Sequence, residues 1–198
     1  MRRVLIWMFG GAALSIALAA CSGISSTSSV ATPAYSIVKA DGAVEIRDYP
    51  ELVVAEITTT GTRDDAVRAG FRPLAGYIFA KEREGEKIAM TAPVTQRAEE
   101  GQDWTIQFIM PAEYTLETLP RPAGSDLRLA TEPAIRRVAI QFSGVANDAL
   151  LAEQEQKLRA WLDAEGLEPV GEPIFAYYND PFTPGFLRRN EVIFNLDQ

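Results

Sequence analysis

The 198-residue sequence contains no histidine and only one cysteine, Cys21. Without an imidazole it has no Ser–His or Cys–His catalytic pair and no histidine to bind a haem iron. Zinc sites are built largely from cysteine and histidine, so a zinc site is excluded as well. An enzyme would have to depend on lysine or on paired carboxylates, and no carboxylate pair has an informative spacing. We therefore expect a protein that is not an enzyme.

The chain is also short of positive charge, with 19 Lys+Arg against 27 Asp+Glu and a formal net charge of −8. Such a surface repels a phosphate backbone, so nucleic acid is not an expected partner. A hydrophobic fraction of 47% and a charged fraction of 23% are typical of a globular chain. This length predicts one domain, or two small and closely packed halves.

The first 21 residues have the pattern of a bacterial export signal. Arg2 and Arg3 precede an apolar run over residues 4–20. Residues 18–21 (LAAC) resemble the lipobox of bacterial lipoproteins, in which signal peptidase cuts before the cysteine and the thiol carries a diacylglycerol. An ordinary signal peptide or an uncleaved anchor is the alternative. Because the only cysteine stands at this place, we expect a lipidated Cys21.

Residues 22–34 are mostly small and polar and show no periodicity, which is typical of a flexible tether. We therefore expect a signal peptide over residues 1–20, a lipidated cysteine and tether over 21–34, and a folded domain over 35–198. Cleavage would leave 17 basic and 27 acidic residues, a net charge of −10. Two or more acyl chains are enough for stable anchoring to a membrane. Serine at position 22 favours the outer membrane of a bacterial cell envelope, facing the periplasm.

The first half of the domain predicts strands around one helix. Residues 35–39, 44–49 and 53–57 have strand-like alternation, and Gly61 ends the third strand. The apolar positions that then recur at helical spacing are Val67, Phe71, Leu74 and Ile78. Pro73 predicts a kink or a helix start near residue 70. Two further strands are expected, the first from the alternation over residues 88–94 and the second over 104–110.

The second half repeats this order. Strands are expected over residues 127–130 and around 138–142, the latter ending at Gly144. Asn147 or Asp148 can cap a long helix that Gly166 ends. Strands then follow over residues 173–178 and 188–196. The sequence thus predicts an α+β fold of duplicated strand–helix–strand–strand units, whose two sheets together form a distorted β-barrel with two flanking helices.

Several short strings, in this order and spacing, resemble the SOUL haem-binding protein family. They are residues 44–49 (VEIRDY), 87–94 (KIAMTAPV), 108–111 (FIMP), 142–144 (FSG), 177–181 (YYNDP) and 186–192 (FLRRNEV). The resemblance covers roughly residues 35–198. It implies a duplicated α+β barrel related to bacterial effector-binding domains, and it implies haem or another tetrapyrrole as the ligand.

The resemblance also implies an apolar groove beside the first helix. The matching positions are Val67, Arg68, Phe71, Leu74, Tyr77 and Ile78. Family members offer an arginine to a haem propionate at the position of Arg68, and Arg72 is one turn further along the helix. Gly76 stands where some relatives have a lysine that would bind an anionic group.

The iron of a haem has few candidate ligands in this chain. Met90 and Met110 lie on faces that we expect to be core, which leaves Tyr77 as the axial candidate. Weak and mainly hydrophobic binding is therefore expected. In residues 188–191 the arginines and Glu191 have a simpler interpretation as a structural polar network. A function of another class stays open, in which the anchored domain binds a protein or another apolar small molecule.

The lipobox gives a direct test. Changing Cys21→Ser removes the only thiol that can carry the lipid, so signal peptidase processing should stop and the precursor should accumulate. Intact-mass measurement of the protein from bacterial membranes should show lipidated Cys21 as the first residue of the wild type. A mature wild-type chain with an unmodified amino terminus would contradict the prediction.

Overall fold

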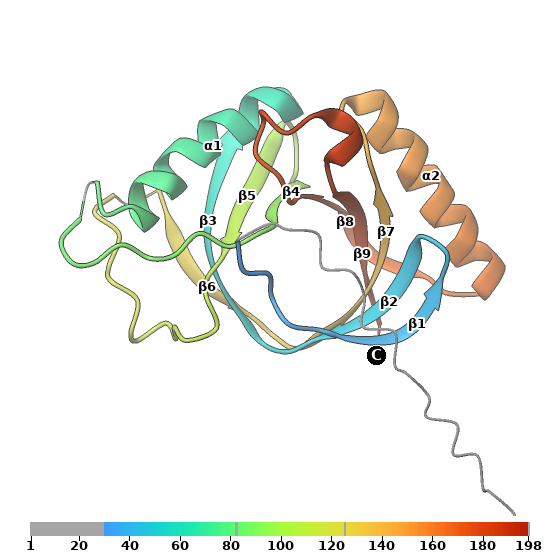
Figure 1. Ribbon diagram of the computed structural model, residues 1–198, viewed down its shortest axis with the longest axis horizontal. Coiled ribbons are helices and arrows are strands. Elements are labelled where there is room, and N and C mark those ends of the chain that lie inside the picture. The colour runs from blue at the N-terminus through green and yellow to red at the C-terminus, as the bar shows by residue number, and fades with distance from the viewer. Residues whose placement is uncertain (1–29, 82, 125, 198) are drawn as a thin grey trace, which may run out of the picture.

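The computed structural model describes residues 30–81, 83–124 and 126–197 (Figure 1). The expected signal peptide and Cys21 lie outside the described residues. Within these ranges the elements in chain order are β1 (Ser36–Asp41), β2 (Val44–Tyr49), β3 (Leu52–Thr60), α1 (Arg63–Ile78), β4 (Val94–Ala98), β5 (Asp103–Ile109), β6 (Arg128–Glu132), β7 (Ile135–Phe142), α2 (Asp148–Glu165), β8 (Pro169–Tyr177), the 3-10 helix η1 (Gly185–Leu187) and β9 (Asn190–Leu196). None of the helices in this part of the chain is long and apolar enough to cross a membrane.

The described strands form a single antiparallel sheet in the order β1-β2-β7-β9-β8-β4-β5-β3-β6. Figure 1 shows the sheet curled upon itself, with α1 on the outer surface of one half and α2 on the outer surface of the other. Helix α1 packs on β3 and β5, and α2 packs on β7, β8 and β9. The predicted α+β class with two flanking helices is confirmed. The barrel is open, and one continuous sheet replaces the two expected sheets because β4 pairs with β8 across the middle.

The domain contains two copies of one unit, β2-β3-α1-β4-β5 and β6-β7-α2-β8-β9. In each unit the last strand lies between the strand that precedes the helix and the strand that follows it. In the first unit β5 lies between β3 and β4, and in the second β9 lies between β7 and β8. The first strand of each unit pairs with the other unit, because β2 pairs with β7 and β6 pairs with β3. The predicted duplication is confirmed. Each unit has one strand more than the sequence pattern indicated, and this additional strand, β2 or β6, pairs with the other unit.

Gly61 and Gly144 have equivalent places in the two units. Each follows the strand before the helix, and their φ angles are 133° and 126°. This region of φ favours glycine, because side chains of L-residues rarely adopt it. Both glycines therefore turn the chain from the sheet onto its outer face, as the sequence pattern predicted.

Helix α1 is continuous from Arg63, so of the two alternatives predicted from Pro73 the helix start near residue 70 is wrong. Thr62 caps the helix by accepting a hydrogen bond from the Asp65 backbone N–H at 3.3 Å. Pro73 is only half-buried and lies within the helix. Packing of the buried face of α1 on the sheet outweighs the hydrogen bond that this proline cannot donate.

The segment over residues 88–93 is not a strand, contrary to its alternating pattern. Ile88 and Ala92 are buried and Met90 is partly buried. The Ile88 backbone N–H donates to the carbonyl of Ile78 at the end of α1, at 2.8 Å, and not to a neighbouring strand. The alternation therefore arises from packing beneath the helix end, and β4 begins only at Val94.

Helix α2 follows the prediction closely. Asn147 accepts the Leu150 backbone N–H at 2.9 Å, and Gly166 ends the helix. Leu158 and Leu162 are fully buried against the sheet. Trp161, predicted to lie on the same apolar face, is partly buried at the margin and donates its indole N–H to Asp41 at 2.9 Å.

The inner face of the curl holds a buried ionic cluster. Arg47 of β2 and Glu191 of β9 are 1% and 0% exposed, and they make two hydrogen bonds of 2.8 and 3.0 Å. Arg189 and Tyr178 donate to the same carboxylate at 2.7 and 2.8 Å. Burial opposes the charge of Glu191, but the hydrogen bonds and charges of Arg47 and then Arg189 hold the pKa of its carboxyl below the usual value. The predicted polar network around Glu191 is confirmed.

A pair of glycines in α1 provides a matched test of helix packing. A Cβ atom at Gly70 would lie 2.6 Å from Ile106 Cγ1 and 2.9 Å from its Cβ, whereas nothing lies within 4 Å of a Cβ at Gly76. Gly70→Ala should therefore lower the free energy of unfolding by about 1–3 kcal/mol through overpacking. Gly76→Ala should raise it by about 0.5–1 kcal/mol, since alanine favours the helix. Urea unfolding of both variants measures this, and equal effects would contradict the close approach at Gly70.

Glu191→Gln should lower the free energy of unfolding by about 3–5 kcal/mol, because it removes the buried charge that Arg47 and Arg189 share and leaves Arg47 with only the partly exposed Glu45 carboxylate at its Nε. Asp48→Asn removes the half-exposed partner of Arg136 and should have a much smaller effect, because solvent screens that pair. The pKa of Glu191 is lowered in the fold, so its contribution is complete above the ordinary glutamate pKa of 4.5 and is lost as the pH falls through the lowered value. Acid unfolding curves should be shallower for Glu191→Gln than for the wild type. Parallel curves would show that the cluster does not depend on this charge.

Candidate functional site

The six predicted site residues divide into three groups on α1. Leu74, Tyr77 and Ile78 are buried in the core between the helix and the sheet. Val67 is partly buried against the same core, and Arg68 and Phe71 are exposed. The helix therefore presents one flank of the predicted set to solvent and keeps the other inside. Ligand binding by these residues stays a prediction.

Tyr77, the axial candidate, has its side chain turned inward. Its hydroxyl donates a hydrogen bond of 2.8 Å to the carbonyl of Pro120, in the loop that covers the end of α1. Burial raises the pKa of this phenol, which disfavours the phenolate that an iron ion would bind. In this structure the tyrosine supports the loop and does not present its oxygen at the surface.

Phe71 is the apolar centre of the exposed flank. Its ring is 41% exposed and meets the buried ring of Phe108 edge to face, with 5.3 Å between the ring centroids. The position of Phe71 follows from the close approach of Gly70 to Ile106. Ile106 and Phe108 are successive residues on the helix-facing side of β5, so the residue after Gly70 meets Phe108. A flat apolar molecule would find an aromatic surface here that is already fixed by the core.

Two arginines stand beside this aromatic surface. Arg68 precedes Phe71 by one turn of the helix and Arg72 follows it directly. In the described ranges neither guanidinium has an ion-pair or hydrogen-bond partner, unlike Arg63 at the start of α1, which pairs with Asp148 at 2.6 Å. Both cations are therefore available to a carboxylate without breaking an existing contact.

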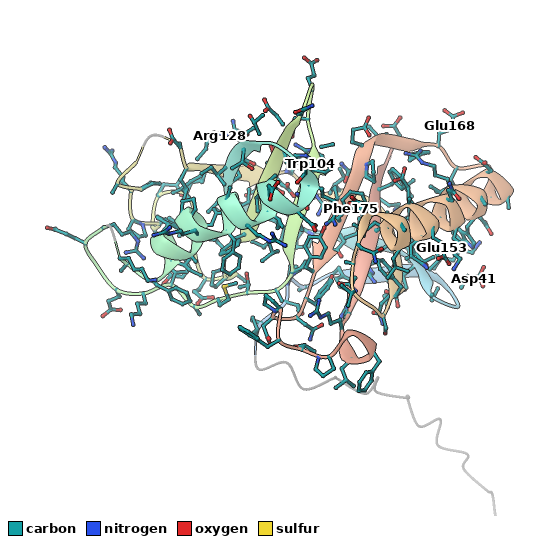
Figure 2. All side chains as sticks on the ribbon, turned by 90° about the horizontal axis from the view of Figure 1, so that it is seen from above. Asp41, Trp104, Arg128, Glu153, Glu168 and Phe175 are labelled. Atoms are coloured by element: carbon teal, nitrogen blue, oxygen red, sulfur yellow. The ribbon has the colours of Figure 1, made fainter. Side chains whose placement is uncertain are left out.

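The junction between the two units is filled by polar contacts that the sequence did not reveal. Arg63 donates to the Tyr177 hydroxyl at 2.9 Å, and this hydroxyl donates to Gln96 at 3.1 Å. Figure 2 shows Trp104 and Phe175 between the two helices, and their ring centroids are 6.5 Å apart. Burial raises the pKa of Tyr177 to about 12, so it remains a neutral hydrogen-bond donor. Partners this far apart in sequence leave no local signal.

Two hollows in the described surface lie away from the predicted site. One of about 270 Å³ is lined by Gly61, Thr62, Arg63, Gly101, Gln102 and Trp104. The other, of about 610 Å³, is lined mainly by charged and polar side chains that include Glu56, Arg97 and Arg128. Neither contains any of the six predicted residues, and the polar lining of the larger hollow does not favour a flat apolar ligand. Among the described residues no cluster of acidic side chains could hold a metal ion.

The curled sheet with one helix across each unit defines a duplicated α+β fold, which solved structures share. An uncharacterized conserved protein from Listeria innocua aligns with a TM-score of 0.59 at 15% identity, over 78% of this chain and 92% of that chain. The C-terminal domain of EcmrR aligns with a TM-score of 0.59 at 14% identity, over 83% and 98%. A hydrolase from Listeria innocua aligns with a TM-score of 0.57 at 15% identity, over 78% and 91%. At these identities the likeness shows the fold alone.

Sequence similarity identifies the family within this fold. The family model described as SOUL heme-binding protein matches residues 30–195. Heme-binding protein 2 of Mus musculus is 32% identical over 166 residues, which are 79% of this chain and 79% of that protein. Heme-binding protein 2 of Homo sapiens is 30% identical with the same coverage. The chain belongs to the SOUL heme-binding protein family, as its motifs predicted.

Proposed function

We propose that this chain binds haem or another tetrapyrrole on the outer flank of α1, without catalysing a reaction on it. The observation that carries the proposal is the family match over residues 30–195. The geometry of α1 supports it, since an exposed aromatic ring lies there with two arginines that have no ion pair among the described residues. The names of the mammalian relatives, heme-binding proteins 1 and 2, point to the same class of ligand.

The flank offers separate groups to the two parts of such a ligand. Phe71 and the partly buried Val67 present apolar surface to the ring system, with Phe108 holding Phe71 in place. Arg68 and Arg72 can each face one carboxylate. Removing apolar area from water supplies about 25 cal/mol per Å², offset by the cost of association. Apolar contact is therefore the main source of affinity in this proposal, and weak binding follows.

Haem, when bound, supplies an iron centre, and this chain has no histidine to ligate it. The Tyr77 hydroxyl already donates a hydrogen bond to the Pro120 carbonyl. Met90 is only partly buried, but it packs against the core beneath α1. The side chains on this flank thus fit the ring and its carboxylates better than they fit the metal. A protein that holds the tetrapyrrole without strong axial ligation is the form of binding that these side chains support.

We also propose that the domain is held at the membrane by a lipid on Cys21, on the periplasmic side of a bacterial outer membrane. The support comes from the basic start, the apolar run and the LAAC string in residues 1–21. A net charge of −10 after cleavage argues against a nucleic-acid partner. Non-enzymatic function is supported by the missing histidine and by the names of the relatives.

Substitutions on α1 test the binding surface. Phe71→Asp removes the aromatic contact and adds a charge that repels carboxylates, so haemin should bind at least about 10-fold more weakly. Arg68→Ala removes one exposed ion pair worth about 0.2–1 kcal/mol, a loss of about 5-fold or less. Val170→Asp is the matched control, because Val170 is 42% exposed on β8 in the other unit, and it should bind like the wild type. Absorbance titration at one ionic strength measures all four proteins.

Three results would contradict parts of this proposal. Unchanged binding by Phe71→Asp would place the ligand elsewhere. Iron-free protoporphyrin should bind about as well as haemin, so a strong preference for haemin, or a low-spin spectrum with two nitrogen ligands, would reveal a ligand to iron that we have not identified. No binding of either molecule would favour a protein partner or a different apolar ligand.

A further inference from the structure

The loop between β8 and β9, residues 178–189, exposes large apolar side chains. Phe182, Phe186 and Leu187 are 94%, 78% and 61% exposed. Exposed Val145 lies against the loop, since its backbone and side chain are the nearest neighbours of Gly185. Figure 1 places the loop, in red, beside the start of α2, and Figure 2 shows it extending beyond the sheet. Apolar groups gathered in this way on a soluble surface mark a contact with something else.

The loop is held in shape by its own polar groups. The Asp180 carboxylate accepts the backbone N–H groups of Phe182 and Thr183 at 2.8 and 3.1 Å, and also the Thr183 hydroxyl. The Arg188 guanidinium donates to the carbonyls of Thr183 and Pro181. The two charged residues that flank the tip are thus bonded to the loop itself. Hydrogen bonds within the loop therefore fix the backbone that carries Phe182 and Phe186.

The tip has the composition that a lipid environment requires. Residues 181–187 (PFTPGFL) carry no charged side chain. The two prolines have no N–H, and the N–H groups of Phe182, Thr183 and Leu187 are hydrogen-bonded within the loop, whereas those of Gly185 and Phe186 have no partner among the described residues. Backbone groups that enter the hydrocarbon core must be satisfied internally, because lipid tails offer no partner, so this tip suits the hydrated interfacial layer and not the core. A protein partner would not require an uncharged tip. The loop also projects from the surface and forms no groove that would hold a peptide.

The start of the described chain leaves from the same end of the sheet as this loop. Ala31 pairs with Thr91, three residues before Val94, and Val94 pairs with Tyr177 in the antiparallel β4–β8 pair. The end of β4 that continues back to Thr91 is therefore the end of β8 that continues into the loop. A membrane anchor on the amino-terminal side would bring this end of the domain toward the bilayer.

We propose that Phe182, Phe186 and Leu187 enter the interfacial layer of the membrane and fix the orientation of the domain on it. This inference rests on the proposed amino-terminal anchoring. Phenylalanine and leucine are typical of the apolar faces that interfacial elements bury about 5–10 Å into the boundary between headgroups and acyl chains. The acidic domain is repelled by anionic headgroups, so insertion depends on these apolar side chains and not on charge.

The test follows the surroundings of residue 182 in the full chain. Phe182→Trp adds an aromatic reporter, and Val170→Trp is the control at the opposite end of β8. A hexahistidine tag inserted after Ser26 holds both proteins to vesicles of phosphatidylethanolamine, phosphatidylglycerol and a nickel-chelating lipid, whether or not Cys21 is lipidated. The chain has no histidine of its own, so the tag is its nickel-binding group. Emission is recorded with and without brominated acyl chains, relative to the tagged parent.

The emission added by Phe182→Trp should shift to the blue on vesicles and should be mostly lost with brominated lipids, whereas the emission added by Val170→Trp should change little. Unshifted and unquenched emission from a tethered Phe182→Trp protein would overturn the proposal. Emission that is already blue-shifted without vesicles, and that depends on protein concentration, would assign the loop to a second copy of the chain and would also overturn it. If the untagged wild type is released from the vesicles, the lipid anchor on Cys21 is refuted. The insertion of the loop is not, because the nickel-held proteins test it without that anchor.

Discussion

The carboxylate of Glu191 is the point on which the inner face of the curled sheet depends. A charge with no exposed surface is tolerated only when it is paired and fully hydrogen-bonded, and here Arg47, Arg189 and Tyr178 together meet that condition. Arg47 comes from the first unit and Glu191 from the second, with β7 between their strands. The ion pair therefore specifies which strands must lie near one another, in addition to what it contributes to stability.

The candidate ligand surface depends on a different constraint, the absence of a side chain at Gly70. The glycine lets α1 approach Ile106 closely, and the same approach brings Phe71 over Phe108 on the next helix-facing position of β5. The position of the exposed aromatic ring is thus set by core packing, through its edge contact with the buried ring of Phe108. A ligand that binds there gains from a surface whose ordering cost has already been met by folding.

Local features of the fold could be predicted from the sequence because their causes are local. Asn147 and Gly166 bound α2, and Gly61 and Gly144 end equivalent strands, since capping and backbone freedom act over a few residues. The partner of Glu191 was not predictable in the same way, because Arg47 is 144 residues away.

The errors have the same origin in contacts that are distant in sequence. The apolar alternation near Ile88 resembled a strand, but the chain there packs under the end of a helix. The burial of Leu74, Tyr77 and Ile78 also depends on distant contacts, because the contact of α1 with β5 sets the rotation of the helix. Ligand binding by these three residues stays a prediction. Phe182 differs from the sequence expectation in the other direction. Its apolar side chain predicts burial, but the residue is exposed in the loop between β8 and β9.

The exchange of β2 and β6 between the two units has a consequence for how such a chain can arise. One unit alone would leave the strand before its helix without a partner on one edge, because that partner comes from the other unit. Two copies of the unit supply each other with the missing strand, which is the geometry of a domain-swapped dimer. The single chain thus has the architecture of such a dimer joined through the segment between β5 and β6, and each half takes one strand of its sheet from the other.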